Sequence, residues 1–271
     1  MKIDLHIHTT YSDGLLTPAQ VVQKARQLNL RFIAITDHDT TEGIPEALEE
    51  AKKNNNLEVI PGIEINTDYK NEEVHILGYY VDYSGNYLKK ALEHMQSSRL
   101  KRAKLITEKL NLLGLNINLE EVMNKASGPS IGRPHIAAAL VEKGFSESLQ
   151  DAFDKYLNRG RPAYVPRERL TPFEAVDLVL NSSGIPILAH PGLIKNQNII
   201  GELIQYGIKG LEVYHKEHSR LQTKHYINVA KHHSLLMTGG SDCHGREPLL
   251  LGTLDIPVEF VLKLKRKKGL I

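Results

Sequence analysis

Short apolar runs alternate with helical patterns through most of the chain. The apolar runs predict strands over 2–9, 32–35, 58–65, 74–81, 185–189, 210–214 and 235–238. Between them, apolar positions at helical spacing predict helices over 18–28, 45–53, 171–180, 199–206 and 219–232. Strands that alternate with helices of this length imply βαβ units and a mostly parallel sheet, which is an α/β fold.

The middle of the chain differs because its pattern is helical throughout. We expect helices over 87–113, 119–126, 134–143 and 146–157, with no strand among them. We interpret residues 87–157 as an all-helical insertion in an α/β domain that comprises residues 1–86 and 158–271. An unusually long crossover connection is the alternative.

Composition and charge narrow the class of protein. The chain has 271 residues, of which 41% are hydrophobic and 24% charged, and its net charge is +2. These values exclude a disordered or fibrous chain and a strongly basic nucleic-acid binder. The single cysteine, Cys243, excludes a disulfide framework and a multi-cysteine zinc site. Without a signal-peptide pattern or a long apolar run, the chain is expected to be cytoplasmic and free of the membrane.

Histidine is unusually frequent, with 13 residues against five phenylalanines and no tryptophan. Together with acidic residues, the histidines form six clusters on or just after the predicted strands. These clusters are Asp4–Asp13, Thr36–Asp39, Pro61–Ile65, Val74–Gly78, Ala189–Gly192 and Gly240–His244. Functional groups of barrel enzymes gather where strands end. One such histidine is typically structural, but six clusters indicate a shared site.

Nine side chains in these clusters are candidate metal ligands. They combine imidazole with carboxylate donors, a set that suits Zn, Mn or Fe(II) better than Mg or Ca. One ion takes four to six ligands, so nine side chains imply two or three divalent ions. The candidates are His6, His8, Asp13, His38, Glu64, His75, His190, Asp242 and His244.

The order of these motifs resembles the polymerase-and-histidinol-phosphatase (PHP) superfamily. The matching motifs are D-x-H-x-H-T with S-D-G, T-D-H-D, G-x-E, H-x-L-G-Y, A-H-P and G-S-D-x-H, and they span the chain. The sequence Gly132–Ala137 further resembles the branch of nucleoside 3′,5′-bisphosphate phosphatases, some of which trim RNA from its 5′ end. That resemblance implies a distorted (β/α)7 TIM-like barrel, with the helical insertion covering the active site.

The resemblance also implies a role for each site residue. One metal position would use His6, His8, Glu64 and Asp242. A second would share Glu64 and add His75 and His190, and a third would use Asp13, His38 and His244. Arg133 and His135 would contact the substrate phosphate. We further interpret His215 as a candidate leaving-group acid that also contacts substrate, and His218 as a candidate substrate contact.

These observations predict a phosphoesterase in which a hydroxide that bridges two ions attacks the phosphorus of a nucleotide ester. A small nucleotide or a short oligonucleotide is the expected substrate, with no obligate protein partner. Three alternatives stay open: a histidinol-phosphate-type phosphatase, a metal-dependent amidohydrolase and a non-catalytic metal-stabilised module.

Overall fold

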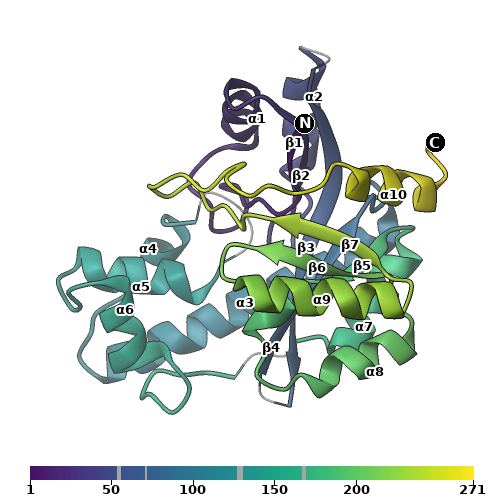
Figure 1. Cartoon of the computed structure of the whole chain (residues 1–271). Helices are drawn as coiled ribbons and strands as arrows, with labels where there is room; N and C mark the ends of the chain where they lie inside the picture. The colour runs from purple at the N-terminus through teal and green to yellow at the C-terminus, as the bar shows by residue number, and fades with distance from the viewer. Residues whose placement is uncertain (54–55, 71, 127–130, 167–168) are drawn as a thin grey trace.

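Seven strands form one sheet in chain order, and this sheet curls into a nearly closed barrel (Figure 1). The computed structural model describes residues 1–53, 56–70, 72–126, 131–166 and 169–271. The strands are β1 (Lys2–Asp4), β2 (Leu30–Ile35), β3 (Glu58–Tyr69), β4 (Glu72–Tyr79), β5 (Ile185–Leu188), β6 (Gly210–His215) and β7 (Leu236–Gly240). The predicted distorted (β/α)7 TIM-like barrel is therefore confirmed.

One strand runs against the others. β4 is antiparallel to both β3 and β5, whereas the remaining neighbours are parallel. In the long β3–β4 ladder Asn66 lies opposite His75, and Asp68 lies opposite Glu73. Residues directly opposite each other point to the same face of a sheet, so His75 and Glu73 share a face with Glu64.

The barrel helices lie outside the strands and shield their outer face. They are α1 (Pro18–Gln27), α2 (Ile44–Lys52), α7 (Pro172–Asn181), α8 (Asn198–Tyr206), α9 (Arg220–His232) and α10 (Glu259–Lys268), with a 3₁₀ turn, η2 (Pro191–Leu193), after β5. Thr17 and Thr171 cap α1 and α7 in capping boxes that place proline first in the helix.

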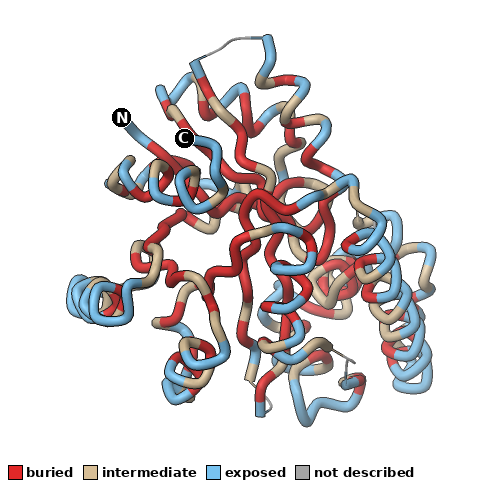
Figure 2. Tube along the Cα trace, turned by 90° about the vertical axis from the view of Figure 1, so that its right-hand side faces the viewer, coloured by how far each residue is buried: buried red, intermediate tan, exposed pale blue. Residues whose placement is uncertain are grey.

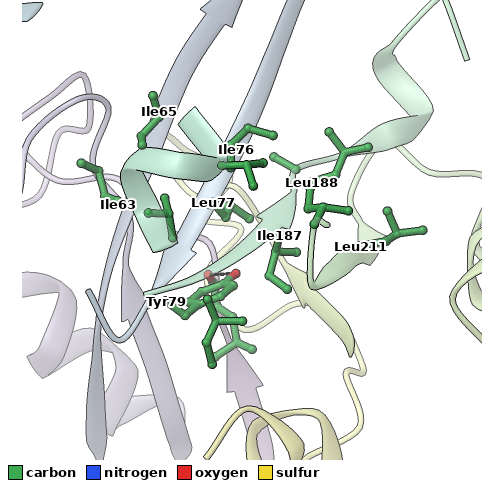
Figure 3. Close-up of a cluster of buried hydrophobic side chains, with 14 of the residues drawn as sticks. Ile63, Ile65, Ile76, Leu77, Tyr79, Ile187, Leu188 and Leu211 are labelled. Carbon is green, nitrogen blue, oxygen red and sulfur yellow. Dashed lines mark hydrogen bonds between the residues drawn. The ribbon is translucent and has the colours of Figure 1, made fainter. Parts of the chain in front are cut away.

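Apolar side chains pack on both faces of the sheet, with Ile63, Ile65 and Ile76 on one face and Leu77 and Tyr79 on the face that carries Glu64. Figure 3 shows part of this core, in which residues of β3, β4, β5 and β6 pack together: Ile63, Ile65, Ile76, Leu77, Tyr79, Ile187, Leu188 and Leu211. The Tyr79 hydroxyl donates a hydrogen bond to the carbonyl of Leu5 at 2.8 Å, which satisfies the polar end of a buried ring. Buried segments concentrate at the centre of the molecule in Figure 2, and the helices present their exposed sides outward.

Between β4 and α7 the described chain is helical. It forms α3 (Asn86–Leu112), α4 (Leu119–Met123), α5 (Arg133–Glu142), α6 (Leu149–Ala152) and a π-helical turn, η1 (Phe153–Leu157). These helices have an apolar cluster of their own, which includes Ile106, Leu110, Ile136 and Leu140. In Figure 1, α4, α5 and α6 lie to one side of the barrel. The division into barrel and insertion stays a prediction.

Several element boundaries differ from the predicted ones. The first strand ends at Asp4 instead of residue 9, because the following residues bond to the segment after β7: the Cys243 N–H donates to His6 O and the His8 N–H donates to Cys243 O. The helix predicted over 146–157 begins at Leu149 and continues from α6 directly into the π-helical turn η1, and α10 was not predicted. None of the described helices is long and apolar enough to cross a membrane.

The C-terminal run 263–268 is strongly basic, a composition that is typical of a solvated chain end. In the structure it forms the last turns of α10, which buries Phe260, Val261 and Leu264 against the barrel. Lys265 also pairs with Glu58 of β3 at 2.8 Å. The helix was not predicted because charged residues dominate its sequence, and its apolar face has only these three strongly buried positions.

Candidate metal centre

The nine candidate ligands come together at one end of the barrel. Glu64, in β3, lies at the middle of the group and is 1% exposed. Its Oε2 lies 3.2 Å from Nε2 of His6 and 3.2 Å from Nε2 of His8. Its other oxygen, Oε1, lies 2.9 Å from Nδ1 of His75 and 3.1 Å from Nε2 of His190. One carboxylate therefore faces two pairs of imidazoles with its two oxygens.

Asp242 completes the first of these pairs. Its Oδ1 lies 3.1 Å from Nε2 of His8 and 3.6 Å from Nε2 of His6. Its Oδ2 faces Nε2 of His215 at 3.6 Å and Nζ of Lys216 at 3.2 Å. Lys216 follows β6 directly and was not singled out in the sequence, where a lysine after a strand carries no signal.

A further group surrounds Asp13, in the turn after β1. Nε2 of His244 lies 3.3 Å from Oδ1 of Asp13, and Nε2 of His38 lies 3.9 Å from Oδ2. His38 also turns its Nδ1 toward Oε2 of Glu64 at 2.9 Å. Donor atoms within 4.8 Å of one another define three groups: His8, Asp13, His38 and His244; His6, His8 and Glu64; His38, Glu64 and His75.

The polar atoms of this centre suit a bound cation. Burying several carboxylates beside imidazoles is costly unless the charges are compensated and the polar atoms have partners. Several buried atoms here lack any hydrogen-bond partner: Nε2 of His6, His8, His75 and His215, Nδ1 of His38 and His190, and Oδ1 of Asp13. Imidazole and carboxylate donors that point at one another without hydrogen-bonding are typical of a metal centre.

Neighbouring charges strongly shift the pKa values of buried side chains in this centre. Burial alone favours the neutral imidazole of His8, but the carboxylates of Asp242 and Glu64 outweigh burial and raise its pKa to about 10. Burial would likewise raise the pKa of Asp13, yet His38 and His244 hold that pKa well below its usual value. In the metal-free protein these charges therefore favour the ionised carboxylate of Asp13 and the protonated imidazole of His8.

Neighbouring backbone turns hold these side chains in place. Asp37 accepts hydrogen bonds from Thr9 N, Thr9 Oγ1 and Ser12 Oγ at 2.6–2.7 Å, which secures the turn after β1. His190 and Asp242 have positive φ angles of 26° and 51°, a conformation that is sparse for residues other than glycine. Gly240 is required for close approach, because a Cβ there would lie 2.2 Å from Cβ of His6.

One buried acid of this centre, Glu212 of β6, was not among the candidate residues. Its Oε1 lies 3.0 Å from Nδ1 of His6, and its Oε2 accepts a hydrogen bond of 2.8 Å from His190 N. Glu212 is fully buried, and such a carboxylate behind an imidazole orients it and raises its basicity. The sequence does contain a signal for this residue, because Glu212, like Glu64, is an acid inside an apolar strand.

We expect Glu212→Gln to lower metal affinity or kcat by about 10- to 100-fold, because glutamine keeps the shape but loses the charge behind His6. Titration of the metal-free protein with Mn²⁺, followed by calorimetry and by activity, measures this effect. Glu217→Gln is the matched control, since Glu217 is exposed and lies five residues further along the chain. An unchanged affinity and an unchanged kcat would contradict an orienting role for Glu212.

Four predicted site residues are not among the nine candidate metal ligands, and each has contacts of its own. Arg133 begins α5, and its Nη2 lies 3.4 Å from Oε1 of Glu73. His135 accepts a hydrogen bond at Nδ1 from Gly132 N at 3.1 Å, which caps the same helix. His215 is buried beside Asp242. His218 donates from Nδ1 to a backbone carbonyl and accepts at Nε2 from Gly192 N, so both of its nitrogens have backbone partners.

A cavity of about 170 Å³ lies between the metal centre and the helices that follow β4. Asp13, His38 and His75 of the centre line this cavity, together with Asn66 and Glu73 of the barrel. Its lining also includes apolar residues of α3 and α5 and four arginines: Arg99, Arg102, Arg133 and Arg169. Arg99 also links α3 to the barrel, because its Nε donates to Oδ2 of Asp39 at 3.0 Å.

Comparisons with known proteins agree with this architecture. The family model of the PHP domain matches residues 4–162. The 5′-3′ exoribonuclease Rnm of Salmonella typhimurium is 36% identical over 247 residues, which cover 89% of this chain and 84% of that protein. The 3′,5′-nucleoside bisphosphate phosphatase of Chromobacterium violaceum is 32% identical over 249 residues, with coverages of 90% and 87%. A crystal structure from Bifidobacterium adolescentis, assigned as a metal-dependent phosphoesterase, is similar with a TM-score of 0.87 and 32% identity over 98% of this chain and 96% of that chain.

A barrel with a cluster of imidazoles and carboxylates at the ends of its strands defines a metal-dependent hydrolase. The chain belongs to the PHP family, and it is a metal-dependent phosphoesterase that hydrolyses phosphoric esters.

Proposed function

We propose that this protein hydrolyses phosphate esters of nucleotides, with nucleoside 3′,5′-bisphosphates, the 5′ ends of short RNA, or both as substrates. The observation that carries the proposal is a cavity lined both by three candidate metal ligands and by four arginines. Bound cations and guanidinium groups in one cavity would suit a compact molecule with more than one phosphate. The names of two relatives, a bisphosphate phosphatase and a 5′-3′ exoribonuclease, support the same class of substrate.

We assign three metal positions to the centre, with Mn, Zn or Fe as the ions. The first uses His6, His8, Glu64 and Asp242, in accordance with the distances around Oε2 of Glu64 and Oδ1 of Asp242. The second uses Oε1 of Glu64 with His75 and His190. The third uses Asp13, His38 and His244, where the donor atoms are less tightly grouped.

When bound, such ions lower the pKa of water to provide a nucleophile and polarise the phosphate. The side chains of the protein supply the remaining roles, which are positioning, charge stabilisation and proton transfer. Glu64 holds both sides of the centre together, and Glu212 orients His6 and the His190 backbone. Arg133 offers positive charge to the phosphate oxygens, the kind of electrostatic term that dominates many enzymes. His215, whose Nε2 is buried and unpartnered beside Asp242, is assigned as proton donor to the leaving oxygen.

The assay that tests this function compares phosphate esters on the Mn²⁺-loaded protein. We expect release of phosphate from adenosine 3′,5′-bisphosphate, or of a mononucleotide from a 5′-phosphorylated trinucleotide, with kcat/KM at least about tenfold above that for histidinol phosphate. His8→Ala is expected to remove this activity, and His225→Ala, at an exposed position of α9, serves as its control. A protein that binds Mn²⁺ and hydrolyses none of these substrates would refute the proposal.

A further inference from the structure

A second cavity, of about 490 Å³, lies between the chain that follows β2 and the first half of α3. None of its described lining residues lines the cavity at the metal centre. The lining combines the rings of Tyr11 and Tyr83 with polar side chains that include Glu42, Lys89, Glu93 and Gln96. We call it the tyrosine cavity. Aromatic rings together with a few polar groups are typical of a pocket that binds a small organic group.

One face of α3 runs along both cavities. The part of this face from Lys89 to Gln96 lines the tyrosine cavity, and the part from Arg99 to Ile106 lines the cavity at the metal centre. The lining positions follow one another mostly at spacings of three or four residues, so they lie in one row along the helix. At the rise of an α-helix, the middles of the two parts are about 15 Å apart. A molecule that fills both cavities is therefore longer than a single nucleotide.

Two turns of the barrel also connect the tyrosine cavity with the metal centre. Tyr11 lies in the turn after β1, two residues before the candidate ligand Asp13, and Thr40 lies two residues after the candidate ligand His38. The ring of Tyr11 packs close to the backbone of Gly43, where a Cβ would lie 3.1 Å from Cδ2 of the ring. Each turn thus supplies one side chain to the metal centre and another to the tyrosine cavity.

The charged side chains of the tyrosine cavity indicate what kind of group it binds. Glu42 and Glu93 contribute two negative charges and Lys89 contributes one positive charge, which leaves an excess of one negative charge. This excess disfavours a phosphate. It suits a neutral group that donates hydrogen bonds, as the amino groups of a base and the hydroxyls of a ribose do. The two tyrosine rings offer faces on which a base stacks whatever its sequence.

We propose that the tyrosine cavity binds the nucleoside of a downstream nucleotide while the 5′ end of a short RNA lies at the metal centre, with the base stacked on Tyr83. This inference rests on the proposed function and deepens it, because it makes the oligonucleotide the substrate that fills both cavities. A nucleoside 3′,5′-bisphosphate fills the cavity at the metal centre alone.

Selectivity between a longer and a shorter substrate tests the tyrosine cavity. For Tyr83→Leu we expect kcat/KM for a 5′-phosphorylated trinucleotide to fall about five- to a hundredfold, since the stacking of one base is lost, while kcat/KM for adenosine 3′,5′-bisphosphate changes less than about twofold. Tyr87→Leu is the matched control, because Tyr87 is an exposed tyrosine four residues further along that is not among the lining residues. An unchanged value for the trinucleotide, or equal losses for both substrates, overturns the proposal.

Photocrosslinking provides a second measurement that does not depend on catalysis. The full-length, Mn²⁺-loaded protein is irradiated with a phosphorothioate trinucleotide that carries 5-iodouridine at its third position, and the adduct is located by mass spectrometry. We expect an adduct on Tyr83 or Tyr11 that an excess of unlabelled trinucleotide suppresses. An adduct confined to other residues, or the absence of an adduct that the competitor suppresses, overturns the site. If the wild type hydrolyses no ester but forms the expected adduct, the proposed function fails while the nucleoside site stands.

Discussion

Glu64→Gln is expected to lower kcat/KM for phosphate esters by about a thousandfold or more, the largest effect of any single substitution considered. Both oxygens of Glu64 face imidazoles at 3.2 Å or less, from His6 and His8 on one side and His75 and His190 on the other. Glutamine removes the negative charge and turns an amide nitrogen toward one of these groups. Steady-state kinetics and metal content by elemental analysis measure the loss.

Glu58→Gln provides the matched control for this substitution. Glu58 begins the same strand, is 40% exposed and pairs with Lys265, so its loss is expected to change kcat/KM less than twofold. The assignment of Glu64 as the shared ligand would be wrong if Glu64→Gln kept a tenth of the wild-type activity with its full complement of metal.

Removal of the metal is expected to abolish activity and to lower Tm by roughly 10 °C, given the stabilisation by a ligand at many times its Kd.

The stability of the metal-free protein is expected to fall as pH rises above neutrality, whereas the stabilisation by bound metal is expected to increase. The pKa of His8 is raised from 6.5 to about 10, so the stability that its proton contributes is complete below pH 6.5 and is lost as pH rises toward 10. Metal binding requires the neutral imidazole and is strengthened over the same range.

Thermal melts at pH 7, 8 and 9, with Mn²⁺ and with chelator, check both expectations. We expect Tm of the chelated protein to fall across this series while the difference between loaded and chelated protein increases. His232→Ala, at an exposed position of α9, is expected to reproduce the wild-type pH profile in both conditions. Two parallel curves would show that metal binding does not displace the proton of His8.

Most of the barrel could be predicted because its strands are short apolar runs separated by capped helices. The pattern does not reveal strand direction, so the antiparallel position of β4 was not predicted. Strand pairing depends on contacts far apart in the sequence, and a run such as Glu72–Tyr79 reads the same in either direction. The helix α10 was missed for a different reason, since its lysines and arginine dominate its composition.

The candidate ligands could be predicted because histidine and acid at strand ends are rare enough to stand out. Glu212 was overlooked because its partners, His6 and His190 N, come from other strands or turns. Arg169 was indistinguishable from the other arginines of its segment. Whether an arginine is solvated or buried against an acid depends on packing between segments, which a local pattern does not contain.

The β3–β4 hairpin carries Glu64, His75 and Glu73 on one face of a single ladder. The register of this ladder therefore sets the positions of the candidate ligand His75 and of Glu73 relative to Glu64. A slip of one residue in β4 would turn His75 and Glu73 outward together while Glu64 stayed in place. An insertion or deletion within β4 is thus expected to displace two acidic or imidazole side chains of the cavity in a single step.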